Sequence, residues 1–152
     1  MVKTVLIGLV NLVVLTGCNK EVEEAVEWID VPLSEATYFG VEGVVRQEAF
    51  EILVLRESAL EFKLGMKAGE AIVYHWDVEM EQPELLTSEF HGHTERVGDA
   101  PGTVMFYTIH NDGAEAGNLI APFDGIHGWY LNNESAEDIV VKLQVAGFFE
   151  VL

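Results

Sequence analysis

The amino-acid sequence predicts an all-β domain, an antiparallel β-sandwich of the jelly-roll type. Apolar and polar residues alternate along several short segments, as in strands with one buried face and one face in water. Turn-forming pairs such as Asp124-Gly125 and Asn132-Asn133 separate these segments, and no long helical pattern lies between them. Short strands at this spacing are typical of sandwiches.

Two segments show the clearest alternation, residues 60–66 and 72–78, in which every second residue is apolar. A break at Gln82-Pro83 follows the second segment. We expect residues 85–93 to return beside residues 72–78 as the second strand of a hairpin. The predicted strands are residues 60–66, 72–78, 85–93, 102–110, 119–123, 126–131 and 139–145.

The first 18 residues show the three regions of a bacterial export signal in the expected order. Lys3 supplies a positive start, and an apolar run over residues 4–16 follows, shorter than the ~20 residues of a membrane-spanning helix. The closing residues resemble the lipobox of bacterial lipoproteins, in which the cysteine thiol accepts diacylglycerol. A plain signal peptide, or an anchor helix with a chance cysteine, is the alternative. The lipobox residues are Leu15, Thr16, Gly17 and Cys18.

This interpretation divides the chain into three parts. Residues 1–17 form a signal peptide that is removed, and residues 18–49 form a lipid-anchored, acidic tether and lead-in. Residues 50–152 form the β-sandwich domain, which is long enough for one hydrophobic core. Because Cys18 is the single cysteine, the domain depends on that core without an internal disulfide.

The charge balance argues against nucleic acids and anionic lipid headgroups as partners. The chain has 26 acidic and 8 basic residues, and its formal net charge is −18. Such a surface repels the phosphates of nucleic acids and of anionic lipid headgroups. It attracts divalent cations and basic proteins, or it serves only to keep the chain in solution.

Histidines and carboxylates give a candidate metal site. In the expected hairpin, His75 lies roughly opposite His91, Asp77 lies near Glu89, and His93 follows one step along. Imidazole and carboxylate ligands together suit zinc or copper. The alternative is that these residues are the ordinary polar row of a solvent-facing strand.

The C-terminal two thirds of the chain also resembles a known group of proteins. The stretch between Phe62 and Val151 is similar to a family of largely uncharacterised bacterial membrane-anchored proteins. Their extracytoplasmic domain resembles the GOLD β-sandwich of p24-type cargo receptors, which implies an interaction module. The segments that carry the resemblance are Lys67-Ala68-Gly69-Glu70, Val73-Tyr74-His75-Trp76, Phe90-His91-Gly92, residues 121–130 with Asn132-Asn133, and Gly147-Phe148-Phe149-Glu150-Val151.

Motifs of common enzyme classes are missing from the sequence. It contains no Gly-x-Ser-x-Gly elbow, no His-Glu-x-x-His pair and no glycine-rich phosphate loop. We therefore expect a non-enzymatic binding module without a required cofactor, anchored through Cys18 to the cell membrane or the outer membrane. The domain would face the periplasm or the exterior and contact an envelope protein. The alternative function is an envelope protein that binds zinc or copper.

Replacing Cys18 with Ser tests the lipoprotein interpretation, because it removes the thiol that would accept the lipid. We expect the Cys18→Ser chain to be unprocessed or released from the membrane, and to take up no labelled palmitate. Cell fractionation and metabolic labelling measure these properties. If the variant is processed and membrane-bound like the parent chain, the interpretation is wrong.

Overall fold

The computed structural model describes residues 40–95, 97–98 and 102–152. The predicted signal peptide, Cys18 and residues 19–39 of the predicted tether lie outside the described residues. The chain divides into two compact units, residues 1–34 and 35–152, and the description below concerns the second. Within the described ranges, no helix is long and apolar enough to cross a membrane.

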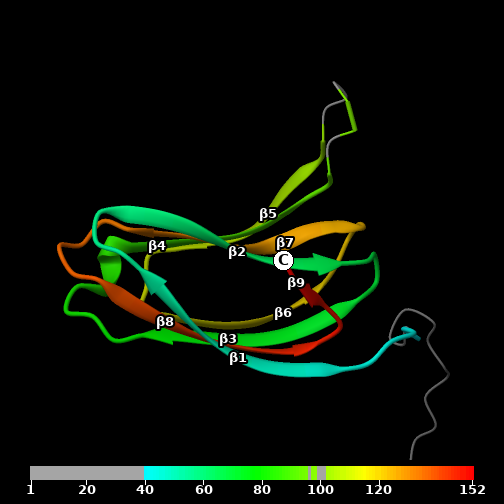
Figure 1. Ribbon diagram of the computed structural model, residues 1–152, viewed down its shortest axis with the longest axis horizontal. Coiled ribbons are helices and arrows are strands. Elements are labelled where there is room, and N and C mark those ends of the chain that lie inside the picture. Colours follow the sequence, from blue (N-terminus) through cyan, green and yellow to red (C-terminus); the bar gives the residue numbers. More distant parts are fainter. Residues whose placement is uncertain (1–39, 96, 99–101) are drawn as a thin grey trace, which may run out of the picture. The chain divides into compact units, whose positions relative to one another are not determined.

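The described residues form a β-sandwich of two antiparallel sheets, which confirms the predicted fold class (Figure 1). The strands are β1 (Arg46–Val54), β2 (Ser58–Met66), β3 (Ala71–Val78), β4 (Leu86–His93), β5 (Val104–His110), β6 (Ala114–Ile120), β7 (Gly125–Asn133), β8 (Ile139–Gly147) and β9 (Glu150–Val151), with a short 3-10 turn at Pro83–Leu85. Sheet A has the strand order β1-β8-β3-β6. Sheet B has the order β5-β4-β7-β2-β9.

Alternation along β3 sets the two faces of sheet A. Ile72, Tyr74 and Trp76 are 1%, 5% and 1% exposed and point into the core. The side chains of His75 and Asp77 lie on the outer face, where about half of each is exposed. A residue such as Trp76 contributes on the order of 3–5 kcal/mol relative to alanine at a fully buried position.

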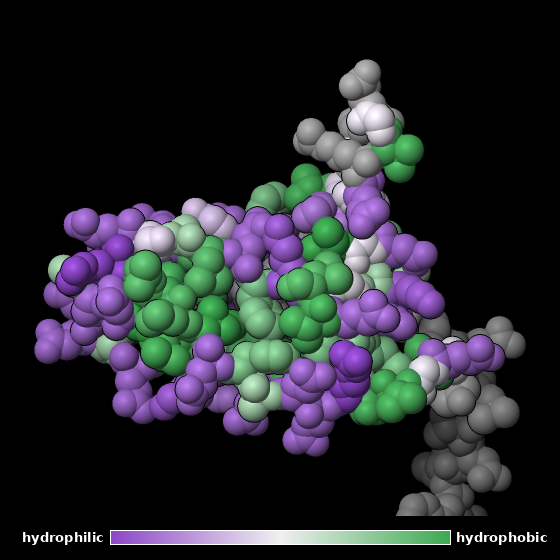
Figure 2. Space-filling view, viewed as in Figure 1, coloured by the Kyte–Doolittle hydropathy of each residue, from purple (hydrophilic) through white to green (hydrophobic). Residues whose placement is uncertain are grey.

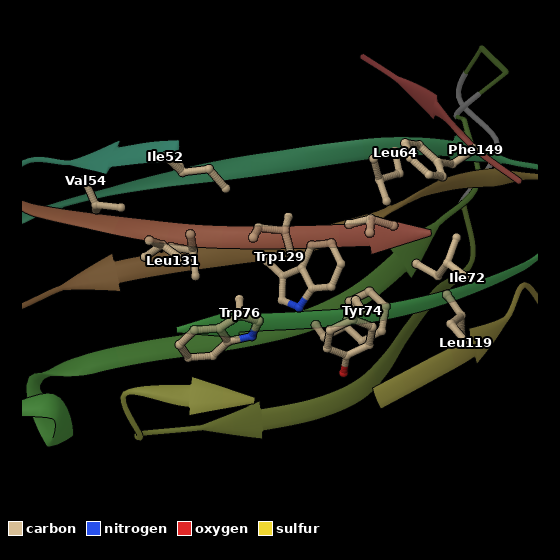
Figure 3. Close-up of a cluster of buried hydrophobic side chains, with 14 of the residues drawn as sticks. Ile52, Val54, Leu64, Ile72, Tyr74, Trp76, Leu119, Trp129, Leu131 and Phe149 are labelled. Carbon is tan, nitrogen blue, oxygen red and sulfur yellow. The ribbon is translucent and has the colours of Figure 1, made fainter. Parts of the chain in front are cut away.

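An aromatic cluster joins the two sheets. In sheet B, the rings of Phe90 and Trp129 are stacked with centroids 4.5 Å apart. Tyr74 of sheet A meets both rings edge-on, at 5.1 Å from Phe90 and 4.9 Å from Trp129. Figure 3 shows Trp129, Tyr74 and Trp76 in this layer between the sheets. Edge-on and offset aromatic contacts of this kind add to the energy of simple burial.

The predicted hairpin between residues 72–78 and 85–93 is wrong. Strand β3 pairs with β6 and β8, whereas β4 pairs with β5 and β7. Residues 79–85, which include the 3-10 turn, carry the chain from sheet A to sheet B. A connection of this length can cross the ~10 Å between packed sheets, so the two strands need not be neighbours.

Strand β1 is absent from the predicted set of strands, and one predicted strand is displaced along the chain. Strand β1 begins at Arg46, within the predicted tether of residues 18–49, and pairs along its length with β8. The strand expected at 119–123 is instead β6, which begins at Ala114 and ends at Ile120. The segment Ala114 to Asn118 contains alanine, glycine and asparagine, which have low strand propensity, so the sequence pattern does not reveal this part of β6.

One side of the sandwich leaves apolar side chains between the sheets partly uncovered. Figure 2 shows apolar side chains along the seam between the two sheets, with hydrophilic ones above and below. Phe50 of β1 and Phe62 of β2 have ring centroids 4.8 Å apart, and both are partly buried against the core. The seam belongs to the core, which continues inward from these rings.

Candidate binding surface

The outer face of sheet B collects polar and aromatic side chains from four strands. We call it the histidine face and define it by Glu61, His91, His93, Phe106 and Tyr130. Strand register brings them together, because Glu61 pairs with Tyr130, and His91 pairs with Phe106. His93 lies two residues along β4 from His91, on the same face. These side chains line an open hollow of about 590 Å³. A hollow of this size can hold several side chains of a partner or a small ligand.

His91 and His93 lie side by side on this face. Their ring centroids are 6.3 Å apart, and the His91 ring is 5.7 Å from Phe106. Nδ1 of His91 is 3.2 Å from the carbonyl of Glu89, and Nδ1 of His93 is 3.2 Å from the carbonyl of Thr94. Because a carbonyl only accepts, each neutral ring carries its proton on Nδ1, which leaves Nε2 as an acceptor.

Carboxylates surround the two imidazoles. Glu61 Oε1 is 3.8 Å from Nε2 of His91, while Glu61 Oε2 is 2.7 Å from Nζ of Lys63. The hydrogen bond from Lys63 lowers the pKa of Glu61, so this carboxylate is ionised at neutral pH. Glu89 and Glu95 also line the hollow, which makes its surroundings negative.

The structure separates the predicted metal ligands into two groups. On the outer face of sheet A, Nε2 of His75 lies 3.5 Å from Oδ2 of Asp77. Glu89, His91 and His93 lie on the outer face of sheet B, on alternate positions of β4 as the sequence pattern predicted. In the part of the chain that the structure describes, no group of three or more His, Cys, Asp or Glu side chains is placed to hold a metal ion.

Sequence reasoning missed Glu61, Phe106 and Tyr130 as members of this surface. Tyr130 pairs with both Glu89 and Glu61, so β7 lies between β4 and β2. The strand order of sheet B sets this arrangement, and a periodic pattern along one strand does not reveal which strands are neighbours. The sequence signal that could have found these three residues is the alternation along their strands, which directs each side chain away from the core.

A second polar group lies inside the sandwich beneath this face. The hydroxyl of Tyr107 donates to Nδ1 of His127 at 2.7 Å, and Nε2–H of His127 donates to the carbonyl of Phe123 at 3.1 Å. Gly92 pairs with His127, and a Cβ at Gly92 would collide with both Nδ1 of His127 and the hydroxyl of Tyr107. Glycine at this position therefore makes room for the buried pair.

Burial determines the protonation of this pair. His127 is fully buried, and desolvation lowers its pKa, with a smaller effect in the same direction from the charge of His93. The hydrogen bond to Phe123 acts in the opposite direction. Burial also raises the pKa of Tyr107 to about 12. Both groups are therefore neutral at physiological pH and act as a structural donor–acceptor pair.

Glu115 of β6 gathers donors from both sheets. The hydroxyl of Tyr74 donates to its Oε1 at 2.6 Å, and Nε1–H of Trp76 donates to its Oε2 at 3.2 Å. The hydroxyl of Thr108, from β5 in sheet B, donates to Oε1 at 3.0 Å. Burial, reinforced by the carboxylate, raises the pKa of Tyr74 well above its ordinary value. The carboxylate thus fixes the edge of sheet A to the edge of sheet B.

A scan against protein-family models finds no match for this sequence, and a search among curated proteins also finds none.

The buried histidine predicts a pH dependence of stability. A lowered folded-state pKa means that the unfolded chain binds more protons, so the free energy of unfolding falls as pH drops below ~6.5, the ordinary histidine value. Above that pH this contribution is fully present. Chemical denaturation between about pH 5 and pH 7 measures it.

The variant His127→Gln is the control, because its amide can also accept from Tyr107 and donate to Phe123. Glutamine does not titrate, so we expect the variant to lack this decline. An equal decline in the parent and the variant would contradict the assignment to His127.

Proposed function

We propose that this chain is a lipid-anchored envelope lipoprotein whose β-sandwich is a non-enzymatic binding module. The observation that carries the proposal is the exposed strand β5 beside the histidine face. Val104, Phe106 and Ile109 on this strand are 58%, 55% and 58% exposed. In Figure 1, strand β5 rises away from the two packed layers. A cluster of exposed apolar side chains next to polar ones is typical of a protein-binding surface.

The composition of this surface supports a protein partner. Aromatic rings of Phe106 and Tyr130 lie with imidazoles and carboxylates around one open hollow. Aromatic side chains provide large contact areas, and the polar groups provide orientation. The net charge of −18 favours a basic protein over nucleic acid or anionic lipid headgroups.

The lipid anchor is supported by the order of the signal regions and by the lipobox-like residues 15–18. Attachment of lipid at Cys18 would hold the module at the cell membrane or the outer membrane, with the sandwich in the periplasm or outside the cell. A module held in this way meets its partners at high local concentration.

Support for a non-enzymatic role comes from the interior. Both ring nitrogens of His127 are already hydrogen-bonded, one to Tyr107 and one to Phe123. A general base needs a free nitrogen within reach of a nucleophile or a substrate. If the chain instead binds zinc or copper, the role falls to His91 and His93, since His75 lies on the opposite sheet.

Photo-crosslinking in cells tests this proposal. A photoreactive phenylalanine analogue replaces Phe106 in the full-length chain, and the control carries the analogue at Val73, which is 63% exposed on the outer face of sheet A. We expect discrete crosslinked products at position 106 and none of them at position 73. The same products at both positions, or none at either, would contradict a binding surface on sheet B.

A further inference from the structure

We propose that the open edge of β5 accepts an extended, basic segment of a partner protein as an added strand of sheet B. This inference rests on the proposed function and specifies how the partner binds. Addition of a strand at a sheet edge uses backbone hydrogen bonds for affinity and alternate side chains for specificity.

Strand β5 is the edge strand of the described sheets that carries no charged residue. Among the described residues it pairs only with β4, and it contains no Pro, Lys, Arg, Asp or Glu. Its one irregularity is a bulge at Tyr107, which lies between Phe106, opposite His91, and Thr108, opposite Phe90. Charged residues, inward-pointing charges, bulges and short length are the devices that normally protect a sheet edge.

Each of the other edge strands of the described sheets carries at least one of these devices. Strand β1 contains Arg46, Glu48 and Glu51, and β9 is only two residues long. Strand β6 carries the inward-pointing Glu115, which is bound by Tyr74 of the neighbouring strand β3. Strand β5 differs from these three edges in having no charged residue, so no charge opposes a strand laid beside it.

Backbone geometry shows which groups the open edge offers. The N–H of Thr94 donates to Thr103 O at 3.0 Å, and the N–H of Thr103 donates to Oγ1 of Thr94 at 2.9 Å. The backbone groups of Thr103 therefore face β4. Because these groups alternate in direction along an antiparallel strand, those of Val104 face the open side.

The charges beside this edge select a basic segment. Glu89 and Glu95 line the hollow on the β4 side of β5, and Glu61 lies further along the same face. A strand added beyond β5 would lie ~10 Å from β4, two strand spacings away. A lysine or arginine side chain laid across the exposed ring of Phe106 can approach these carboxylates, and its alternate apolar neighbours can cover β5.

A second copy of this chain is the less suitable occupant. Two chains that each carry a net charge of −18 repel one another. In a β5–β5 pair, each edge would also bring its own row of carboxylates and no compensating basic row.

A synthetic peptide tests the inference directly. The probe is a peptide of about eight residues that alternates valine and lysine, titrated into the purified full-length chain. The control peptide has the same charge but is interrupted by prolines, so that it cannot form a ladder. We expect the first peptide to bind at least about tenfold more tightly than the control, and to protect the amides of β5 from hydrogen exchange.

Substitutions on β5 distinguish strand addition from general attraction to an acidic chain. Val104→Pro removes the N–H on the open side, whereas Val104→Thr keeps it. Ile109→Lys places a charge on the edge, and Val73→Lys makes the same change of charge on a central strand of sheet A. We expect Val104→Pro to weaken binding about tenfold more than Val104→Thr does, and Ile109→Lys to weaken it about tenfold while Val73→Lys leaves it unchanged. Circular dichroism verifies that each variant is folded.

Four results would overturn the inference. Three are equal binding of both peptides, binding without protection of β5 amides, and a dimer in sedimentation whose β5 amides are protected without peptide. The fourth is no binding of either peptide. Site-specific crosslinks at Phe106 in cells would still support the proposed function in that case, so the two failures are distinguishable.

Discussion

The contact of Tyr74 with the stacked rings of Phe90 and Trp129 is the interaction on which the rest of the structure depends. This contact packs the inner face of β3 against the inner faces of β4 and β7. Because neighbouring residues of a strand point to opposite sides, this burial sends His75 outward on sheet A and His91 outward on sheet B. The interior packing thus decides which polar residues can share a surface.

The same constraint separates what the sequence reveals from what it does not. The alternation of Ile72, Tyr74 and Trp76 with polar residues predicts strand β3 and its buried face, because burial has a period of two along a strand. Its spatial neighbours β6 and β8 depend on long-range pairing. A break at Gln82-Pro83 is compatible with a tight hairpin and also with a crossing between sheets, and only packing of the whole chain decides between them.

The candidate surface shows the same division. The sequence predicts that Glu89, His91 and His93 share one face, and the structure places them on the outer face of sheet B. Glu61 and Tyr130 join them only through the order β4-β7-β2, which carries no local sequence signal. Below this face, the neutral pair of Tyr107 and His127 and the carboxylate of Glu115 hold the β5 side of the sandwich together. A fixed scaffold of this kind suits a module whose outer strand receives a partner.

The separation of His75 from His91 is the most direct test of this account. Spin labels at positions 75 and 91, on a full-length chain that carries Cys18→Ser, can be compared with labels at 75 and 144, which are paired neighbours on β3 and β8. Electron paramagnetic resonance should give a short separation for the 75–144 pair. For the 75–91 pair the account predicts a separation well beyond ~10 Å, because the labels lie on opposite outer faces of two packed sheets. A separation of ~5 Å, as between facing residues of a hairpin, would contradict it.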